Sequence, residues 1–268
     1  MAPVICEVAF RCQSLACSSL MLNFSRIAAA TIENDPYQWA IVNGLFSNDD
    51  AIALSKRFPC DHFKTVTGDD GEKGYEYEAR ALIGMGEDQP AFAADLDRTW
   101  NDFTNDLLSQ SYRAAMTQLT GVDLSTLTIE ANAFHYGRGA WLGPHVDLRE
   151  KIVTHIFYFN EAWDGDEGGS LSILGSQNLN DVRASVPPII GSSVVLVRSD
   201  NSWHAVPPVS NQSRISRRSL ALTFYAPGSV STMWPPGDRT PLHTFDETRR
   251  SSGRGHRSWS NVLRRVWR

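Results

Sequence analysis

Six short runs rich in β-branched and aromatic residues fill the second half of the chain and constrain its fold more than any other feature. Glycine, asparagine, aspartate and proline separate the runs, as expected where strands end in turns. Many short strands punctuated in this way are typical of a β-barrel or jelly roll. We find no helical period and no internal repeat in this half. The predicted strands cover residues 127–136, 152–159, 171–174, 192–197, 203–206 and 219–225.

Helical signals occur in the first half of the chain. Residues 37–42 predict a short strand, and Ser47, with an acid three positions later, predicts the start of a short helix that ends near Arg57. Apolar residues then recur at helical spacing between Pro90 and Gly121. This period predicts one long amphipathic helix that packs on the outside of a sheet.

Residues 67–89 are rich in glycine, aspartate and glutamate. Such a composition favours a solvated loop. The alternative is a lid over an active site, in which Arg80 is available to hold an acidic group of a substrate.

Both ends of the chain lack the patterns of the centre. We predict a poorly ordered N-terminal arm over residues 1–30 and a single domain over residues 31–230. Residues 231–268 form a basic tail, in which Trp259 and Leu263 recur at helical spacing. We expect this tail to dock on its own domain or to stay mobile.

Composition excludes several classes of protein. With 268 residues, 42% of them hydrophobic, the chain is long enough to bury one full core. No apolar run approaches the roughly 20 residues that cross a bilayer. A net charge of −5 argues against a general nucleic-acid binder. Four cysteines at irregular spacing predict no disulfide framework, which favours the cytoplasm.

His145 and Asp147 are the first candidate metal ligands. Alternate side chains of an extended strand share a face, so both can point at one ion. His204, which follows the predicted strand over 192–197, is the third candidate. Two histidines and one carboxylate suit non-haem Fe(II). Zinc also accepts these ligands, so a zinc hydrolase is an alternative.

An ordered set of motifs resembles the Fe(II)/2-oxoglutarate-dependent oxygenases, nearest their prolyl-hydroxylase branch. The likeness is close over residues 125–226 and holds only in outline before them. It implies a mainly β fold with flanking helices: a double-stranded β-helix (jelly-roll, cupin-like) core with the N-terminal helices packed outside. The motifs are His145-Val146-Asp147, Val153-Thr154-His155-Ile156-Phe157-Tyr158-Phe159-Asn160, Gly168-Gly169-Ser170-Leu171, Trp203-His204-Ala205-Val206 and Arg217-Arg218-Ser219-Leu220-Ala221-Leu222.

The resemblance implies a cofactor set of Fe(II), 2-oxoglutarate as cosubstrate and O2. It makes His145, Asp147 and His204 the iron ligands. Asp147 also argues for hydroxylation, because the related halogenases carry a small residue at that position and bind chloride there.

Three arginines compete to hold the far carboxylate of 2-oxoglutarate: Arg214, Arg217 and Arg218. Strand alternation places Arg217 on one face with Ser219 and other small residues, which favours Arg217 over Arg218. The resemblance adds Tyr158 as a partner of the same carboxylate, and Tyr136 lies near the metal strand. The candidates for the substrate pocket are Arg80, Asn132, Phe134 and Trp141.

The function expected from this resemblance is hydroxylation of an unactivated C–H bond of a small molecule, an amino acid or a specialised metabolite, with release of succinate and carbon dioxide. One alternative is a peptidyl hydroxylase of the prolyl type. A second, of another class, is a non-catalytic jelly-roll module that binds a metal or a ligand. We expect no nucleic-acid or membrane partner.

Overall fold

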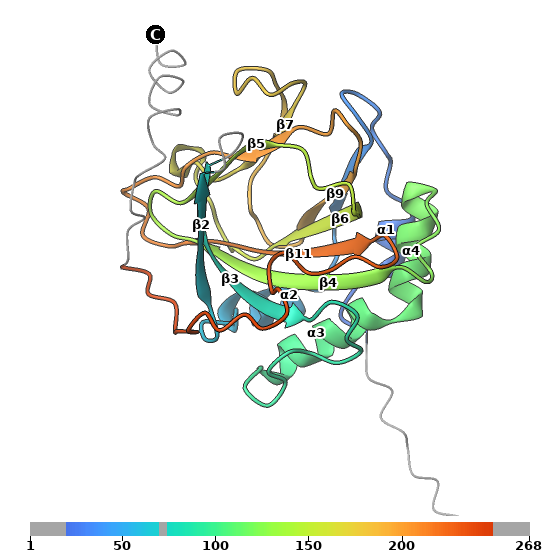
Figure 1. The fold of residues 1–268 in the computed structure, drawn as a ribbon, viewed down its shortest axis with the longest axis horizontal. Coiled ribbons are helices and arrows are strands. Elements are labelled where there is room, and N and C mark those ends of the chain that lie inside the picture. The colour runs from blue at the N-terminus through green and yellow to red at the C-terminus, as the bar shows by residue number, and fades with distance from the viewer. Residues whose placement is uncertain (1–19, 70–73, 249–268) are drawn as a thin grey trace, which may run out of the picture.

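The computed structural model describes residues 20–69 and 74–248, in which all the paired strands are antiparallel. They form one sheet in the order β1-β9-β6-β11-β4-β3-β5-β10-β7-β8, with β2 paired to β3. In Figure 1, β5 and β7 lie opposite β11 and β4. This architecture confirms the predicted mainly β core. The strands are β1 (Trp39–Asn43), β2 (Lys64–Asp69), β3 (Gly74–Ile83), β4 (Thr128–Tyr136), β5 (Trp141–His145), β6 (Lys151–Tyr158), β7 (Leu171–Leu174), β8 (Val182–Val186), β9 (Ser192–Val197), β10 (His204–Val206) and β11 (Arg217–Tyr225).

The helices pack on the outer side of the sheet (Figure 1). The helix predicted to start at Ser47 is confirmed, because the Ser47 side chain accepts a hydrogen bond from the Asp50 amide. None of the helices in the described part of the chain is long and apolar enough to cross a membrane. They are α1 (Phe24–Ala28), α2 (Asn48–Lys56), α3 (Arg98–Leu108), α4 (Gln110–Thr120) and the 3-10 helix η1 (Gly165–Glu167).

The prediction of one long helix between Pro90 and Gly121 is wrong. Two helices, α3 and α4, meet at Ser109, whose backbone is extended (φ −70°, ψ 150°). The Ser109 hydroxyl accepts a hydrogen bond from the Tyr112 amide and so caps the second helix. The apolar period continues across the break because both helices bury the same side, and for this reason the sequence pattern concealed it.

Alternation along β11 separates the core from the pocket. Leu220, Leu222 and Phe224 are fully buried in the cluster that includes the helices. Ser219 and Thr223 face the other way and line the pocket. The strand therefore divides the molecule into an apolar layer under the helices and a polar interior on its opposite face.

The prediction of a solvated loop or lid over residues 67–89 is wrong for the described residues up to Ile83, because β2 and β3 form a hairpin and β3 lies inside the sheet, next to β4. Residues 86–89 are exposed, as predicted. Glu76, Glu78 and Arg80 of β3 are buried rather than solvated. Arg80 is fully buried and donates from Nε to the Asp61 carbonyl at 3.1 Å. Glu78 accepts a hydrogen bond from Thr65 and lies 3.0 Å from His243.

Packing extends beyond both predicted boundaries of the domain. Residues 20–30, assigned to the arm, contain α1, and Leu22 and Ile27 are buried in the core. Asp106 accepts hydrogen bonds from the backbone amides of Met21 and Leu22 at 2.7 and 2.9 Å. Residues 231–248 of the predicted tail also pack on the sheet. Residues 249–268, which carry the predicted basic helical pattern, lie outside the described residues.

Candidate active site

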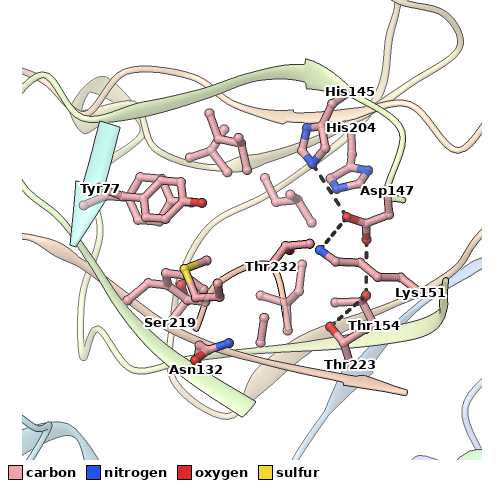
Figure 2. A pocket seen from close by; sticks show the side chains of 18 of the residues that line it. Tyr77, Asn132, His145, Asp147, Lys151, Thr154, His204, Ser219, Thr223 and Thr232 are labelled. Atoms are coloured by element: carbon pink, nitrogen blue, oxygen red, sulfur yellow. Dashed lines mark hydrogen bonds and ion pairs between the residues drawn. The ribbon is translucent and has the colours of Figure 1, made fainter. Parts of the chain in front are cut away.

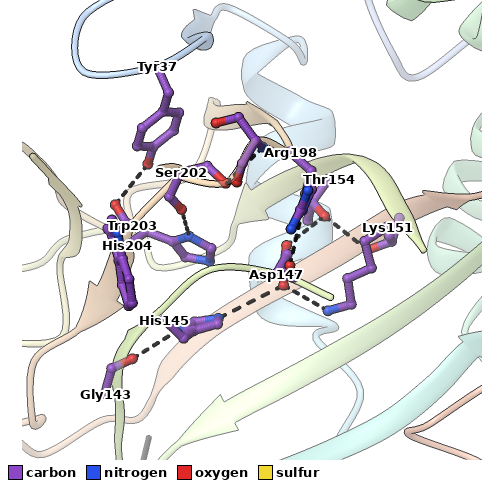
Figure 3. A network of polar contacts seen from close by, with 12 residues as sticks. Tyr37, Gly143, His145, Asp147, Lys151, Thr154, Arg198, Ser202, Trp203 and His204 are labelled. Carbon is purple, nitrogen blue, oxygen red and sulfur yellow. Dashed lines mark hydrogen bonds and ion pairs between the residues drawn. The ribbon is translucent and has the colours of Figure 1, made fainter. Parts of the chain in front are cut away.

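His145, Asp147 and His204 converge at one end of β5. Their ligand atoms all lie within 4.8 Å of one another. His145 and His204 are direct partners in the register between β5 and β10, and their ring centroids are 4.2 Å apart. Asp147 follows β5, with Oδ1 3.9 Å from His145 Nε2 (Figure 3). The structure thus brings together the three residues that the sequence proposed as a metal site.

The two histidine rings are held in similar ways. Nδ1 of His145 lies 2.9 Å from the Gly143 carbonyl, and Nδ1 of His204 lies 3.0 Å from the Ser202 carbonyl. A carbonyl only accepts, so each Nδ1 donates its proton. The lone pair of each ring is then on Nε2, which is the form that a metal ligand requires.

Asp147 is a carboxylate surrounded by donors. Its Oδ1 accepts from Lys151 Nζ at 3.0 Å, and its Oδ2 accepts from Thr154 Oγ1 at 3.2 Å. Burial opposes the ionised form, but the charge of Lys151 and the nearby His204 and His145 hold the pKa of Asp147 well below its usual range. The side chain is therefore ionised at neutral pH, as a metal ligand should be.

Arg217 lies on the pocket-facing side of β11, 2% exposed. Nε donates to the Gly169 carbonyl and Nη1 to Ser219 Oγ, both at 2.7 Å. Its guanidinium carbon stands 4.8 Å from the centre of the Tyr136 ring and 5.3 Å from that of Tyr158. No acid among the described residues forms an ion pair with it. Its buried positive charge is thus positioned for an anion that is not a side chain.

The surroundings of Arg217 leave little room for change. Gly169 has φ +65°, and an added Cβ would lie 3.0 Å from Val209, 3.2 Å from Trp163 and 3.4 Å from Arg217. A glycine is needed there both for the left-handed backbone and for the close approach.

Two tyrosines complete this end of the site. The hydroxyl of Tyr158 is buried and has no hydrogen-bond partner among the described residues. Burial raises its pKa, and burial likewise raises the pKa of Tyr136 to about 12, although Arg217 opposes both shifts. Both hydroxyls are therefore protonated and can donate to a ligand.

A pocket of about 850 Å³, its open mouth included, joins the triad to Arg217. Figure 2 shows the triad and Ser219 on the walls of this pocket. Of the predicted substrate residues, Asn132 and Phe134 line it. The structure places Trp141 outside the pocket, against Leu174 and Ala205. The pocket is lined by Tyr77, Asn132, Phe134, Tyr136, Leu142, His145, Asp147, Lys151, Thr154, Ile156, Leu171, His204, Val206, Arg217, Ser219, Ala221, Thr223, Tyr225, Thr232 and Met233.

Three predicted residues lie elsewhere. Arg80 is buried beside Asp61 and does not line the pocket. Arg218 points to the opposite side of β11, where its Nη2 lies 2.9 Å from Glu247. Arg214 is exposed. Among the three arginines proposed for the cosubstrate, only Arg217 lines the pocket.

Sequence reasoning missed the wall that residues 231–240 provide, which we call the C-terminal wall. Thr232 and Met233 line the pocket. Ser231 Oγ donates to Glu130 at 2.7 Å, and Trp234 Nε1 donates to Asn132 at 2.6 Å. No strand or helix period marks these residues, so pattern reasoning had no signal for them.

Lys64, at the start of β2, contacts the C-terminal wall through three interactions. Its Nζ donates to the Met233 carbonyl at 2.6 Å, pairs with Asp238 and lies 4.0 Å above the Trp234 ring. Outside the wall, an open groove runs along residues 64–67 and shares Tyr77, Asp147, Lys151, Thr232 and Met233 with the pocket. The pocket is thus continuous with a surface groove.

Comparisons with known proteins agree with this geometry. The family model of the 2OG-Fe(II) oxygenase superfamily matches residues 131–225. Mouse "Prolyl 3-hydroxylase OGFOD1" is 29% identical over 142 residues, which are 50% of this chain and 26% of the relative. The chain therefore spans about a quarter of the length of that relative.

Two solved structures share the fold. A prolyl-4-hydroxylase from Pseudomonas putida aligns with a TM-score of 0.53 and 19% identity, over 74% of this chain and 98% of that one. A 2OG-Fe(II) oxygenase family oxidoreductase from Burkholderia pseudomallei aligns with a TM-score of 0.50 and 16% identity, over 76% and 91%. These likenesses confirm the double-stranded β-helix core that the sequence predicted.

Proposed function

We propose that this chain is a member of the 2OG-Fe(II) oxygenase superfamily, whose family model matches residues 131–225, and that it is a non-haem iron, 2-oxoglutarate-dependent dioxygenase that hydroxylates an unactivated C–H bond. The observation that carries the proposal is one pocket with an ionised 2-His-1-carboxylate cluster at one end and a buried Arg217 without an acidic partner at the other. The cluster suits Fe(II), and the arginine suits a dicarboxylate.

The donor set fits both groups. His145, Asp147 and His204 would hold Fe(II), and Arg217, with Ser219, would hold the far carboxylate of 2-oxoglutarate. Tyr136 and Tyr158 would donate hydrogen bonds beside that carboxylate. When bound, Fe(II) and 2-oxoglutarate supply the oxidation: with dioxygen, 2-oxoglutarate becomes succinate and carbon dioxide, and one oxygen atom enters the substrate C–H bond.

The protein orients the metal ligands and partly excludes water from the site. Thr154 orients the Asp147 carboxylate through Oδ2, and the two backbone carbonyls fix the histidine rings. Apolar side chains form much of the remaining wall and limit the entry of water. These apolar side chains are Leu142, Ile156, Leu171 and Val206.

A small molecule, an amino acid or a specialised metabolite, remains the first candidate for the substrate. A peptide side chain is the second candidate, because the pocket opens into the groove along β2, which can hold a longer chain. The mouse relative, a prolyl 3-hydroxylase, and the structural neighbour from Pseudomonas putida, a prolyl-4-hydroxylase, favour this second candidate. We retain the cytoplasm as the expected compartment.

The decisive measurement is succinate formation from 2-oxoglutarate with Fe(II) and dioxygen, combined with a mass-spectrometric screen of small molecules and peptides for gain of one oxygen. We expect His145→Ala and Asp147→Ala to abolish both signals. Asp200→Ala, which removes an exposed carboxylate, should retain them. Activity that survives in both ligand variants would refute the assignment.

Two rival functions give different results in the same samples. A non-catalytic module would bind metal and 2-oxoglutarate but release no succinate. A zinc hydrolase would retain zinc after purification and would keep its turnover when the charge of Arg217 is reversed.

A further inference from the structure

Lys151 is a cationic side chain at the mouth of the pocket that the proposed function does not use. It lines both the pocket and the outer groove. Its Nζ lies 3.0 Å from Asp147 Oδ1, and its side chain is 25% exposed (Figure 2). Lysine is a flexible point charge, so its ammonium can reach a ligand beside the metal without movement of the backbone.

A charge count shows that the loaded pocket holds one positive charge in excess. The count rests on the proposed function. The charged side chains that line the pocket are Asp147, Lys151 and Arg217. The two positive charges of Fe(II) cancel the two negative charges of 2-oxoglutarate, and Asp147 cancels Arg217. One positive charge is left in the pocket, and of the two cations Lys151 is the one that also lines the outer groove, from which a substrate enters.

Glu130, the acid on the pocket-facing side of β4, does not balance the excess positive charge of the pocket. Glu130 is 1% exposed, accepts a hydrogen bond from Ser231 and does not line the pocket. Asp238 lines the outer groove, but Lys64 is its ion-pair partner. Among the described residues of the pocket wall, Asp147 is the one acid in contact with Lys151.

We propose that Lys151 binds a carboxylate of the substrate once the metal and 2-oxoglutarate are in place, and so makes the enzyme selective for anionic substrates. A single ammonium balances the charge of one carboxylate. A neutral substrate would leave the excess positive charge in a partly desolvated pocket, which is unfavourable.

Binding of two small probes tests this without knowledge of the substrate. The protein is saturated with Mn(II), which enhances the relaxation of nearby protons, and with 2-oxoglutarate. The methyl-proton relaxation of acetate is then compared with that of acetamide, its neutral analogue. We expect acetate to bind about three- to fivefold more strongly, the ratio typical of a partly exposed ion pair.

Variants of the chain identify the side chain responsible. Lys151→Met should abolish the preference for acetate, and Lys151→Arg should keep it. Arg149→Met is the matched control, because it removes the same charge from an exposed residue that does not line the pocket. The inference is wrong if acetate and acetamide relax equally in the native protein, if the preference survives in Lys151→Met, or if Arg149→Met loses as much.

The same samples separate this inference from the proposed function. Failure of the native protein to bind Mn(II) and 2-oxoglutarate would overturn both. Binding of Mn(II) and 2-oxoglutarate without any preference for acetate would overturn only the role of Lys151.

Discussion

Arg217 and Arg218 are adjacent residues on β11 with opposite environments. Arg217 is buried among Gly169, Ser219 and two tyrosine rings, on the pocket side. Arg218 lies on the other side of the strand and pairs with Glu247. Since both are arginines, their roles differ only because successive side chains of a strand point to opposite faces.

We predict that Arg217→Met lowers the affinity for 2-oxoglutarate about 10- to 100-fold, because hydrogen bonds to a charged group contribute roughly 1.5–3 kcal/mol. Arg218→Met is the matched control and should change that affinity less than about twofold. Titration calorimetry of 2-oxoglutarate into the Mn(II)-loaded protein measures both values. A larger effect in Arg218→Met than in Arg217→Met would contradict the assignment.

For single residues, the alternation of side chains along a strand predicted their positions correctly, whereas the composition of residues 67–89 did not. Alternation placed Arg217 on the pocket side and His145 near Asp147, both of which the structure bears out. Arg80 was a candidate for substrate binding because its segment, rich in glycine and acids, was compatible with a lid over an active site. In the structure it is fully buried on a central strand, where Asp61 contacts it. No sequence pattern marks Lys151 as part of the site, because most lysines lie on the solvated surface.

The C-terminal wall is an element without secondary structure, and side-chain anchors fix its position. Lys64 makes three of these contacts: with the Met233 carbonyl, with Asp238 and with the Trp234 ring. Thr232 and Met233 lie between Ser231, which donates to Glu130, and Trp234, which donates to Asn132. Since both residues line the pocket, the wall determines part of the pocket's shape.

We predict that Lys64→Met loosens this wall. The free energy of unfolding should fall by about 1–3 kcal/mol, the usual cost of losing hydrogen bonds to a charged group. Hydrogen–deuterium exchange should rise in residues 231–240. Lys56→Met, the same change at an exposed lysine of α2, is the control and should leave exchange in that segment unaltered. Equal exchange in the two variants would show that Lys64 does not hold the wall.

At the element scale, the sequence predicted α2 and six of the eight strands over residues 128–225, since their apolar periods and caps are local. It missed β8, whose exposed Val182 and Arg183 give no apolar alternation, and it joined α3 to α4. It also read the β2–β3 hairpin as a loop. The charged residues of that hairpin are stabilised by partners distant in sequence, such as His243 for Glu78, and a local pattern cannot show them.

Two buried histidines make the stability of the whole molecule depend on pH. His155 contacts Tyr112 and Ser193, and His135 contacts Ser216 and the Pro59 carbonyl. Burial lowers the pKa of each from 6.5 to about 3. Between these values the unfolded chain binds protons that the folded protein does not, so stability is complete above pH 6.5 and is lost as the pH falls toward 3.

We predict that each histidine contributes a slope of about 1.4 kcal/mol per pH unit within that window. His155→Gln should therefore reduce the pH dependence of the unfolding free energy by about this amount between roughly pH 5.5 and 4.5. Chemical denaturation at a series of pH values measures the slope. Tyr112→Phe, which removes a partner of His155 but no proton in this range, should lower stability and keep the slope. An unchanged slope in His155→Gln would contradict the prediction.

At the scale of the molecule, the core was predictable but its limits were not. Segments at both ends pack against the central sheet and its helices through single contacts rather than through periodic faces. Asp106 binds the backbone of Met21 and Leu22, and Phe245 stacks on His135 with ring centroids 3.8 Å apart. Such contacts join residues far apart in the sequence, so only the folded structure shows that these segments belong to the domain.

The adjacent arginines of β11 also limit how the gene for this protein can vary. Arg217 is paired in register with Tyr136, and the connection over residues 207–216 sets that register. A single-codon deletion in the connection that shifted β11 by one position would place Arg218 at the pocket-facing position of Arg217 and would turn Arg217 to the opposite face, at the position of Ser216. Every leucine of the strand would change sides at the same time. Insertions or deletions in this connection are therefore tolerated only where the loop changes its shape without shifting the register of β11. Conservative replacements of its residues leave the register unchanged.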